Sequence, residues 1–283
     1  MKKEFTTREM AYLILAHEDV AMLNILVARL VKTGDVFVHL DKGSTIKMQE
    51  INTFPNLQVY SEFVVKWGGW SIVQATQLLA DKAISSGHSR LTLLSGVSYP
   101  IVSDEKLIEL SQSKTDIFEA RNVDLNVISR TFKRRFTTRH LEFKMQNSLF
   151  SRIVRRASRE FFNLLPKLDP IKEMEPVKIS LGSQWWSVTS DTYLKSMELV
   201  EKYPNIEKYF KKIECSDESF FSSLFNRVSV DNLNRGTTYL VFGNKGRPAI
   251  IQNSDIDQEG KFFFARKLSS SQREVIDSLQ SKK

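Results

Sequence analysis

The first half of the chain alternates continuous apolar runs with apolar residues spaced three and four positions apart. The continuous runs predict buried strands over residues 11–16, 35–40, 57–60 and 91–95. The spaced residues predict one helix that ends before Gly34, a second over residues 70–84, and a third that begins at Asp104. Alternating strands and helices indicate an α/β fold with a mainly parallel sheet flanked by helices.

The second half has a less regular pattern. Residues 114–180 are rich in arginine and phenylalanine, and within them residues 148–165 place apolar side chains on one helix face and four arginines on the other. Further helices are predicted over residues 190–203, 205–212, 217–227 and 270–281. Nothing resembles an interdomain linker. We therefore expect a single domain, with a nucleotide-binding half (1–113) and an acceptor-binding and catalytic half (114–283).

The composition limits the cellular compartments and the kinds of partner that fit this protein. The formal net charge of +8 favours an anionic partner, either nucleotide phosphates, nucleic acid or an acidic membrane surface. Cys215 is the only cysteine, which excludes an intrachain disulfide and is typical of a reducing compartment. The first apolar run is too short for a signal peptide or a membrane span. The expected location is the cytoplasm, at most peripheral to a membrane.

Candidate ligand-binding residues lie at the predicted strand ends. In parallel α/β sheets, ligands bind beyond the carboxyl ends of the strands, where His17, Asp41 and residues 95–99 fall. The sequence contains no nucleophile elbow, phosphate-binding loop or GxGxxG motif. Its formal Asp-x-Asp motif, Asp255 to Asp257, comes too late in the chain for a metal site behind a strand and is interpreted as an acidic loop.

Seven short motifs occur in a fixed order along nearly the whole chain. They are AYLILAH (11–17), VHLDK (38–42), VKWGGWSIVQA (65–75), LSGVSYPI (94–101), GSQWW (182–186), SDE (216–218) and FARK (264–267). Together they resemble the core-2/I-branching β-1,6-N-acetylglucosaminyltransferases and the related peptide xylosyltransferases, and more closely their compact bacterial relatives.

The resemblance implies a GT-A-like nucleotide-diphospho-sugar transferase fold, a UDP-sugar donor and inversion at the anomeric carbon. Such a transfer needs one general base and positive charge on the leaving diphosphate. Glu218 matches the family's base, although the proline of the family motif is missing here. Ser216 or Asp217 would cap the helix that follows. An acidic residue in a first helical turn is also favourable without any catalytic role.

The resemblance implies that basic side chains, and not a metal ion, bind the diphosphate. No metal and no other cofactor is therefore expected. Lys267 matches the lysine that binds the diphosphate. A second basic residue is expected upstream, and we assign it to one of Arg235 and Arg247. The alternative for Lys267 is a solvated basic residue after an apolar strand.

The remaining site residues are assigned to the two substrates. His17, Asp41 and Ser98 are expected to line the nucleotide pocket, although the family usually has aspartate where Ser98 stands. Glu119 matches an acceptor-binding glutamate. Trp185 and Trp186 are expected to stack on sugar rings, with one of the two serving instead as core packing.

The sequence thus predicts an inverting, metal-independent transferase that moves N-acetylglucosamine from UDP to a glycan or lipid-linked glycan acceptor, in bacterial surface polysaccharide or lipopolysaccharide synthesis. Xylosyl or glucosyl transfer on the same fold is an alternative. A basic protein that binds nucleic acid or a membrane without catalysis is another, although no nucleic-acid-binding motif is present. The 148–165 helix is expected either to dock on an anionic membrane or to pack on the core with a solvated basic face.

Overall fold

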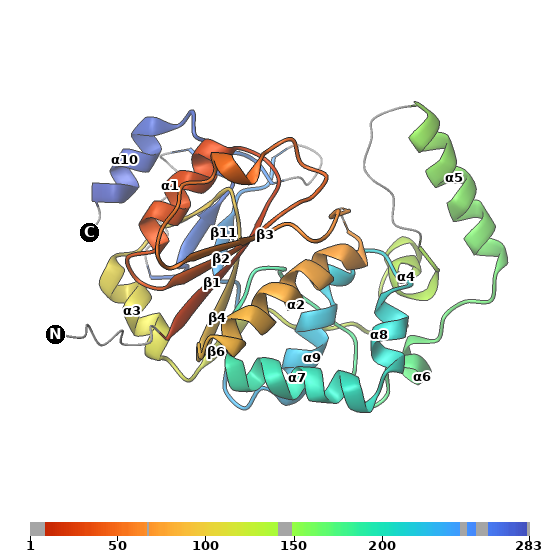
Figure 1. Cartoon of the computed structure of the whole chain (residues 1–283). Coiled ribbons are helices and arrows are strands. Elements are labelled where there is room, and N and C mark those ends of the chain that lie inside the picture. The colour runs from red at the N-terminus through yellow and green to blue at the C-terminus, as the bar shows by residue number, and fades with distance from the viewer. Residues whose placement is uncertain (1–8, 67, 141–148, 244–247, 253–259, 282–283) are drawn as a thin grey trace.

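A computed structural model describes residues 9–66, 68–140, 149–243, 248–252 and 260–281, and a seven-stranded sheet forms its centre (Figure 1). The strands follow the order β10 (Asn232–Asn234), β6 (Asp116–Phe118), β9 (Ser187–Thr189), β4 (Arg90–Ser95), β1 (Met10–Ala16), β2 (Asp35–Leu40) and β3 (Leu57–Tyr60). All neighbouring pairs are parallel except the two that β9 makes. The predicted α/β fold with a mainly parallel sheet is confirmed, and its strands come from both predicted halves of the chain.

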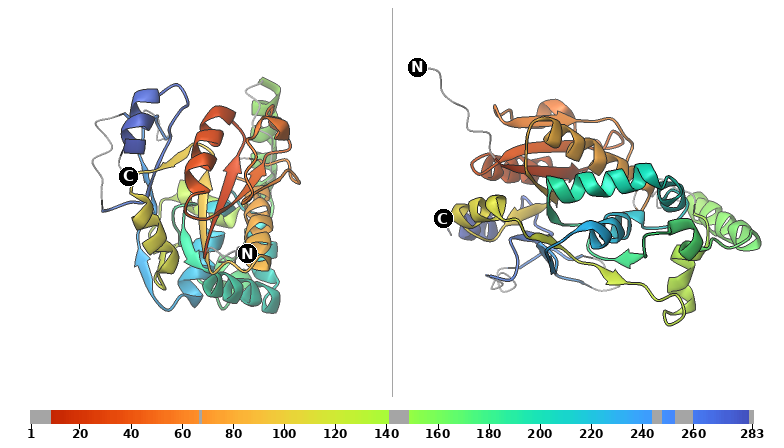
Figure 2. Two further views of the ribbon diagram at one scale, coloured as in Figure 1. Left: turned by 60° about the vertical axis from the view of Figure 1, so that its left-hand side comes forward. Right: turned by 90° about the horizontal axis from the view of Figure 1, so that it is seen from below.

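The central strand β1 is apolar on both faces because helices cover both. Ala11 and Leu13 belong to one hydrophobic cluster, whereas Tyr12 and Ile14, which point the other way, belong to a second. The first cluster contains residues of α2 (Trp70–Ser85), α7 (Ser190–Lys202), α8 (Asn205–Phe210) and α9 (Phe220–Val228). The second contains residues of α1 (Val20–Leu30), α3 (Asp104–Gln112) and α10 (Arg273–Ser281). Figure 2 shows the two helical layers on either side of the sheet.

Two smaller sheets complete the strand pairing. One has the order β11 (Thr238–Leu240), β12 (Phe264–Arg266) and β5 (Ser98–Pro100), and the other pairs β7 (Arg121–Asn122) with β8 (Ser180–Leu181). The last part of the chain returns to the first, because Ser270 donates its backbone N–H to Asp19 at 2.9 Å and α10 packs in the same cluster as β1. The carboxyl end of β1 therefore meets the segment that follows β12.

The arginine-rich middle of the chain forms α4 (Arg130–Thr137), α5 (Leu149–Leu164) and α6 (Pro170–Met174). Both α4 and α6 contribute to the first core cluster, through Phe136 and Met174. By contrast, α5 extends beyond the body of the protein in Figure 1 and in the right-hand view of Figure 2. Its C-terminal turn does not pack on the core, because Phe161 and Leu164 are 59% and 85% exposed.

The predicted helices and strands agree with the structure except near residue 217. A short 3-10 turn, η2 (Ser216–Glu218), precedes α9, and the break falls at Ser219. A second 3-10 turn, η1 (Met48–Glu50), leads into β3. Across the described ranges, none of the helices combines the length and apolar content needed to cross a bilayer.

Candidate functional site

The carboxylate predicted as the catalytic base, Glu218, is held by an arginine from a distant helix. Arg135 of α4 donates from Nη2 to Oε2 of Glu218 at 2.9 Å, and both side chains are partly exposed. A charge-assisted bond of this length fixes the orientation of a carboxylate while its second oxygen stays available. The site therefore begins with an acidic group that is accessible and positioned.

The backbone around Glu218 is shaped by Cys215 and Gly68. Cys215 has a φ of 54°, a left-handed conformation that starts the η2 turn, and its N–H donates to the Gly68 carbonyl at 2.8 Å. Gly68 itself has a φ of 67°, which only glycine adopts without strain, and a Cβ there would lie 3.3 Å from the Cys215 sulfur. The KWGGWS segment thus supports the turn that presents Glu218. Burial raises the pKa of the Cys215 thiol to about 12, which keeps the thiol protonated and unreactive.

Gly182 joins two further predicted site residues. Its N–H donates to the Glu218 carbonyl at 2.9 Å. A Cβ at this position would overlap the carbonyl oxygen of Glu119 and lie 2.7 Å from Oγ of Ser222. The close approach of three chain segments therefore needs glycine, and it brings the backbones of Glu119 and Glu218 to the same residue. The Glu119 carboxylate forms an ion pair with Arg121 at 2.7 Å.

Replacing Gly182 with alanine should loosen this junction. The added methyl group has backbone on one side and a buried helix on the other, so the segments must move apart. We expect Gly182→Ala to lower the free energy of unfolding by about 1–3 kcal/mol and to impair turnover. Denaturant unfolding and steady-state kinetics measure both. Gly236→Ala is the matched control, because the nearest atom to a Cβ there is 3.7 Å away, and an equal effect of the two substitutions would contradict the close-approach argument.

Asp217 does not have the capping role predicted for it. Neither η2 nor α9 has a side-chain cap, and within the described structure the Asp217 Oδ1 and Ser216 Oγ atoms are buried without a hydrogen-bond partner. The 3-10 turn directs both side chains inward instead of toward the first N–H groups of α9. Burial, and secondarily the negative charge of Glu218, raises the pKa of Asp217 to about 7.

Basic side chains gather at the carboxyl end of β1. Lys267 forms an ion pair with Glu18 at 2.5 Å, and the His17 ring lies 3.8 Å from the same carboxylate oxygen. Burial alone would raise the pKa of Glu18, but the Lys267 ammonium outweighs it and the pKa lies below its ordinary value. Burial lowers the pKa of Arg266, and the Glu18 carboxylate opposes that shift. Lys267 is thus paired with a carboxylate at the carboxyl end of β1.

The GSQWW segment connects the acidic and the basic parts of the site. Its first residue, Gly182, contacts Glu218, and Trp185 lies under the Arg266 guanidinium with 4.9 Å between the guanidinium carbon and the ring centroid. Trp186 is 1% exposed and packs against Phe221 and Phe225, which agrees with the expectation that one indole is core. Trp185, at 5%, is also largely covered, so a sugar could reach only the edge of its ring.

The three residues assigned to the nucleotide pocket differ in accessibility. His17 has a side chain that is 58% exposed at the end of β1. Asp41 uses Oδ1 to accept the N–H groups of Gly43 and Val65, each at 2.8 Å. Ser98 is fully buried and accepts the Ser95 N–H at 3.3 Å, so its hydroxyl faces the protein backbone in this structure.

The assignment of an upstream arginine beside Lys267 stays a prediction. Arg235 is half-buried and lines a cavity of about 590 Å³ beside α3, together with Lys106 and Phe262. Arg247 lies outside the described residues, as do Trp67, Asp255 and Asp257. Among the described residues, no three His, Cys, Asp or Glu side chains are grouped so that they could hold a metal ion.

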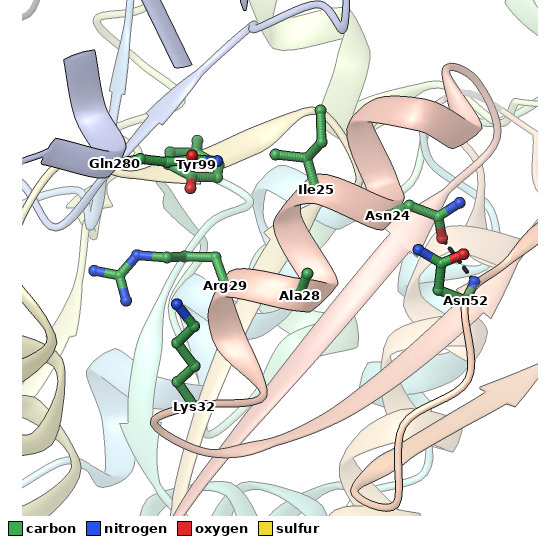
Figure 3. A pocket seen from close by; sticks show the side chains of 8 residues that line it. All are labelled: Asn24, Ile25, Ala28, Arg29, Lys32, Asn52, Tyr99 and Gln280. Carbon is green, nitrogen blue, oxygen red and sulfur yellow. Dashed lines mark hydrogen bonds between the residues drawn. The ribbon is translucent and has the colours of Figure 1, made fainter. Parts of the chain in front are cut away.

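A second cavity, of about 360 Å³, runs along α1 (Figure 3). The side chains of Arg29, Lys32 and Gln280 reach into it, and Tyr99 lies behind them. Arg29 is neutralised by an ion pair with Asp104. Tyr99 is the one lining residue that falls within the predicted strand-end segment 95–99, and neither Glu218 nor Lys267 lines this cavity.

Sequence reasoning missed three residues of the site. Arg135 lies in the arginine-rich stretch 114–180, where no local pattern singles it out. Arg266 stands beside the predicted Lys267 within the same FARK motif. Glu18 follows His17 directly, so the end of the first strand carried the signal for this carboxylate.

The mainly parallel sheet flanked by helices agrees with a GT-A-like nucleotide-sugar transferase fold. A model of the Core-2/I-Branching enzyme family matches residues 10–259 of the chain. The chain therefore belongs to this family of glycosyltransferases. No protein with a curated description matches the sequence. Among solved structures, a putative glucose-1-phosphate thymidylyltransferase from Bacillus anthracis, in complex with a sucrose, is 15% identical, with a TM-score of 0.30, and the match covers 71% of this chain and 83% of that one.

Proposed function

We propose that this glycosyltransferase moves a sugar, N-acetylglucosamine from UDP in the first instance, to a hydroxyl of a glycan acceptor, with inversion and without a metal ion. The observation that carries the proposal is the Glu218 carboxylate, held by Arg135 and joined through Gly182 to Glu119. The cellular role we propose is synthesis of a bacterial surface polysaccharide in the cytoplasm.

The mechanism follows from the two charged groups. Glu218 accepts the proton of the acceptor hydroxyl through the oxygen that Arg135 does not occupy, and the hydroxyl oxygen attacks the anomeric carbon. The bond from that carbon to the diphosphate breaks, and UDP leaves with the electron pair. A single displacement inverts the configuration. Lys267, with Arg266 beside it, supplies positive charge where the leaving group develops negative charge.

A donor screen tests this function directly. We expect transfer from one UDP-sugar in a panel that includes the N-acetylglucosamine, glucose and xylose donors, and the activity should survive a chelator. The physical reason is that basic side chains can neutralise the diphosphate without a metal. Product analysis by mass spectrometry and NMR measures transfer and anomeric configuration. Loss of activity with EDTA and its return with manganese would contradict the metal-independent mechanism.

Removing the Lys267 charge should weaken both binding and turnover. An ammonium that contacts the diphosphate stabilises the bound nucleotide and the transition state alike. We expect Lys267→Ala to weaken UDP affinity by about tenfold, the scale of one charge-assisted contact, and to lower kcat/KM by more. Calorimetric titration with UDP and steady-state kinetics provide the two measurements.

Glu18→Gln is the complementary variant. It removes the carboxylate that pairs with Lys267 at 2.5 Å and leaves the ammonium free for the nucleotide. UDP should then bind more tightly than to the unaltered protein. If both variants leave UDP affinity unchanged, Lys267 belongs to the solvated surface and not to the donor site.

A further inference from the structure

The α5 helix is attached to the protein mainly through its C-terminal end. Arg134 of α4 donates from Nη2 to Oδ1 of Asn163 at 2.8 Å, and Arg139 donates from Nη1 to the Pro166 carbonyl at 2.6 Å. Among the described elements, none makes an extensive contact with α5, and Figure 1 shows the helix extending beyond the body. A helix of 16 residues in this position is marginal in water without a partner surface.

The C-terminal part of α5 exposes large apolar side chains. Leu164 is 85% exposed and Phe161 is 59% exposed. Leu149, Ile153, Val154 and Ala157 occupy the positions that continue this face at helical spacing. An amphipathic helix of a globular protein normally turns such a face toward the core. Here Phe161 and Leu164 leave the C-terminal part of this face exposed, which indicates a surface that binds something apolar.

Positive charge is concentrated on α5 and on α4, the helix that contacts it. Together α4 and α5 contain eight arginine and lysine residues and one glutamate, a net charge of +7, while the whole chain has a net charge of +8. In α5, the arginines occupy positions 152, 155, 156 and 159, which share the face opposite the apolar one. The partner must therefore offer negative charge together with an apolar interior.

We propose that α5 docks this protein on an anionic membrane surface, with its apolar face in the acyl region and its arginines at the headgroups. An apolar face opposite an arginine-rich face is the pattern of helices that lie in the membrane interface. A nucleic acid would use the charge but would leave Phe161 and Leu164 without a partner. The exposed apolar side chains therefore favour an anionic membrane over a nucleic acid as the partner.

Docking through α5 also indicates the class of acceptor, an inference that rests on the proposed function. Arg134 contacts α5, and the next residue, Arg135, contacts Glu218. The helix that holds the base is thus the helix that anchors the docking surface. A docked protein presents Glu218 close to the lipid surface, where the acceptor class that fits is a glycan linked to a lipid.

Vesicle co-sedimentation of the whole protein tests the docking without any catalytic readout. We expect binding to vesicles that contain phosphatidylglycerol to exceed binding to phosphatidylcholine vesicles by more than about tenfold, since each basic residue near the surface adds attraction. Equal binding to both, or no binding to either, would overturn the proposal. Binding to RNA with a steep salt dependence but not to vesicles would overturn it in favour of a nucleic-acid surface.

Matched variants locate the surface. Phe161→Ser with Leu164→Ser should reduce vesicle binding by about tenfold or more, while Ile108→Ser with Leu194→Ser, at exposed positions elsewhere, should not.

Changing the four α5 arginines to glutamine should abolish the preference for anionic lipid. The same number of charges removed at Lys32, Lys106, Lys114 and Lys195 should leave it intact. Equal losses in each pair would show that the effect is general hydrophobicity or net charge, and would refute docking through α5. Melting temperatures verify the fold.

Discussion

Glu218→Gln should lose about a hundredfold or more in kcat while it folds and binds UDP almost as the unaltered protein does. The amide preserves the size of the side chain and an oxygen that can accept the Arg135 bond at 2.9 Å, but it cannot take a proton from the acceptor hydroxyl. General-base catalysis contributes roughly a hundred- to ten-thousandfold, and an inverting displacement has no second carboxylate that must act as nucleophile. The measurement is kcat with the donor that the screen identifies.

Two comparisons make this result specific. Glu214→Gln, an exposed acidic residue four positions earlier, should leave kcat unchanged. Asp217→Asn should reduce kcat less than Glu218→Gln does, because the buried Asp217 side chain does not reach a substrate. Near-normal turnover of a folded Glu218→Gln enzyme would remove Glu218 from the mechanism.

Asp217→Asn should make the protein more stable in alkaline solution. The pKa of Asp217 is raised from 3.8 to about 7 by burial and by the adjacent Glu218 charge, so the folded protein binds a proton that the unfolded chain releases. Stability from this group is complete below pH 4, falls as the pH rises toward 7, and is constant above that. The difference amounts to about 4 kcal/mol at most.

The test is denaturant unfolding at pH 5 and pH 8. Asparagine has no charge to bury, so the stability of Asp217→Asn relative to the unaltered protein should be greater at pH 8 than at pH 5. Glu214→Gln, which removes an exposed carboxylate from the same segment, is the control and should show little change. A relative stability of Asp217→Asn that does not change with pH would mean that Asp217 is not buried as a carboxyl group.

Hydrophobic periodicity predicted the long elements of this fold. The apolar run at 11–16 is β1, and the helical spacing over 70–84 is α2, because each buries a full face of side chains. Strands such as β9 and β10 have three residues each and leave no periodic signal. The α4 helix was not predicted, since only Phe136 of it is buried.

Contiguous motifs nominate candidate site residues, whereas pairings between distant segments cannot be predicted from the sequence. Glu218 and Lys267 each stand in a motif of the family. The Arg135 contact to Glu218 joins residues 83 positions apart, and no local pattern encodes such a pairing. Ser98 was assigned to the nucleotide pocket from its motif. In the structure, the turn between β4 and β5 brings its hydroxyl to the Ser95 backbone N–H.

The return of the C-terminal segment to the first strand bears on how the protein is made. Tyr12 and Ile14 of β1 share a cluster with Val275, Ile276 and Leu279 of α10, and the loop after β1 is held by Ser270. The contacts from α1 to this face of β1 can form early, whereas those from α10 and Ser270 need a segment that is synthesised more than two hundred residues later. Packing on this face is therefore expected to be completed only after α10 has left the ribosome.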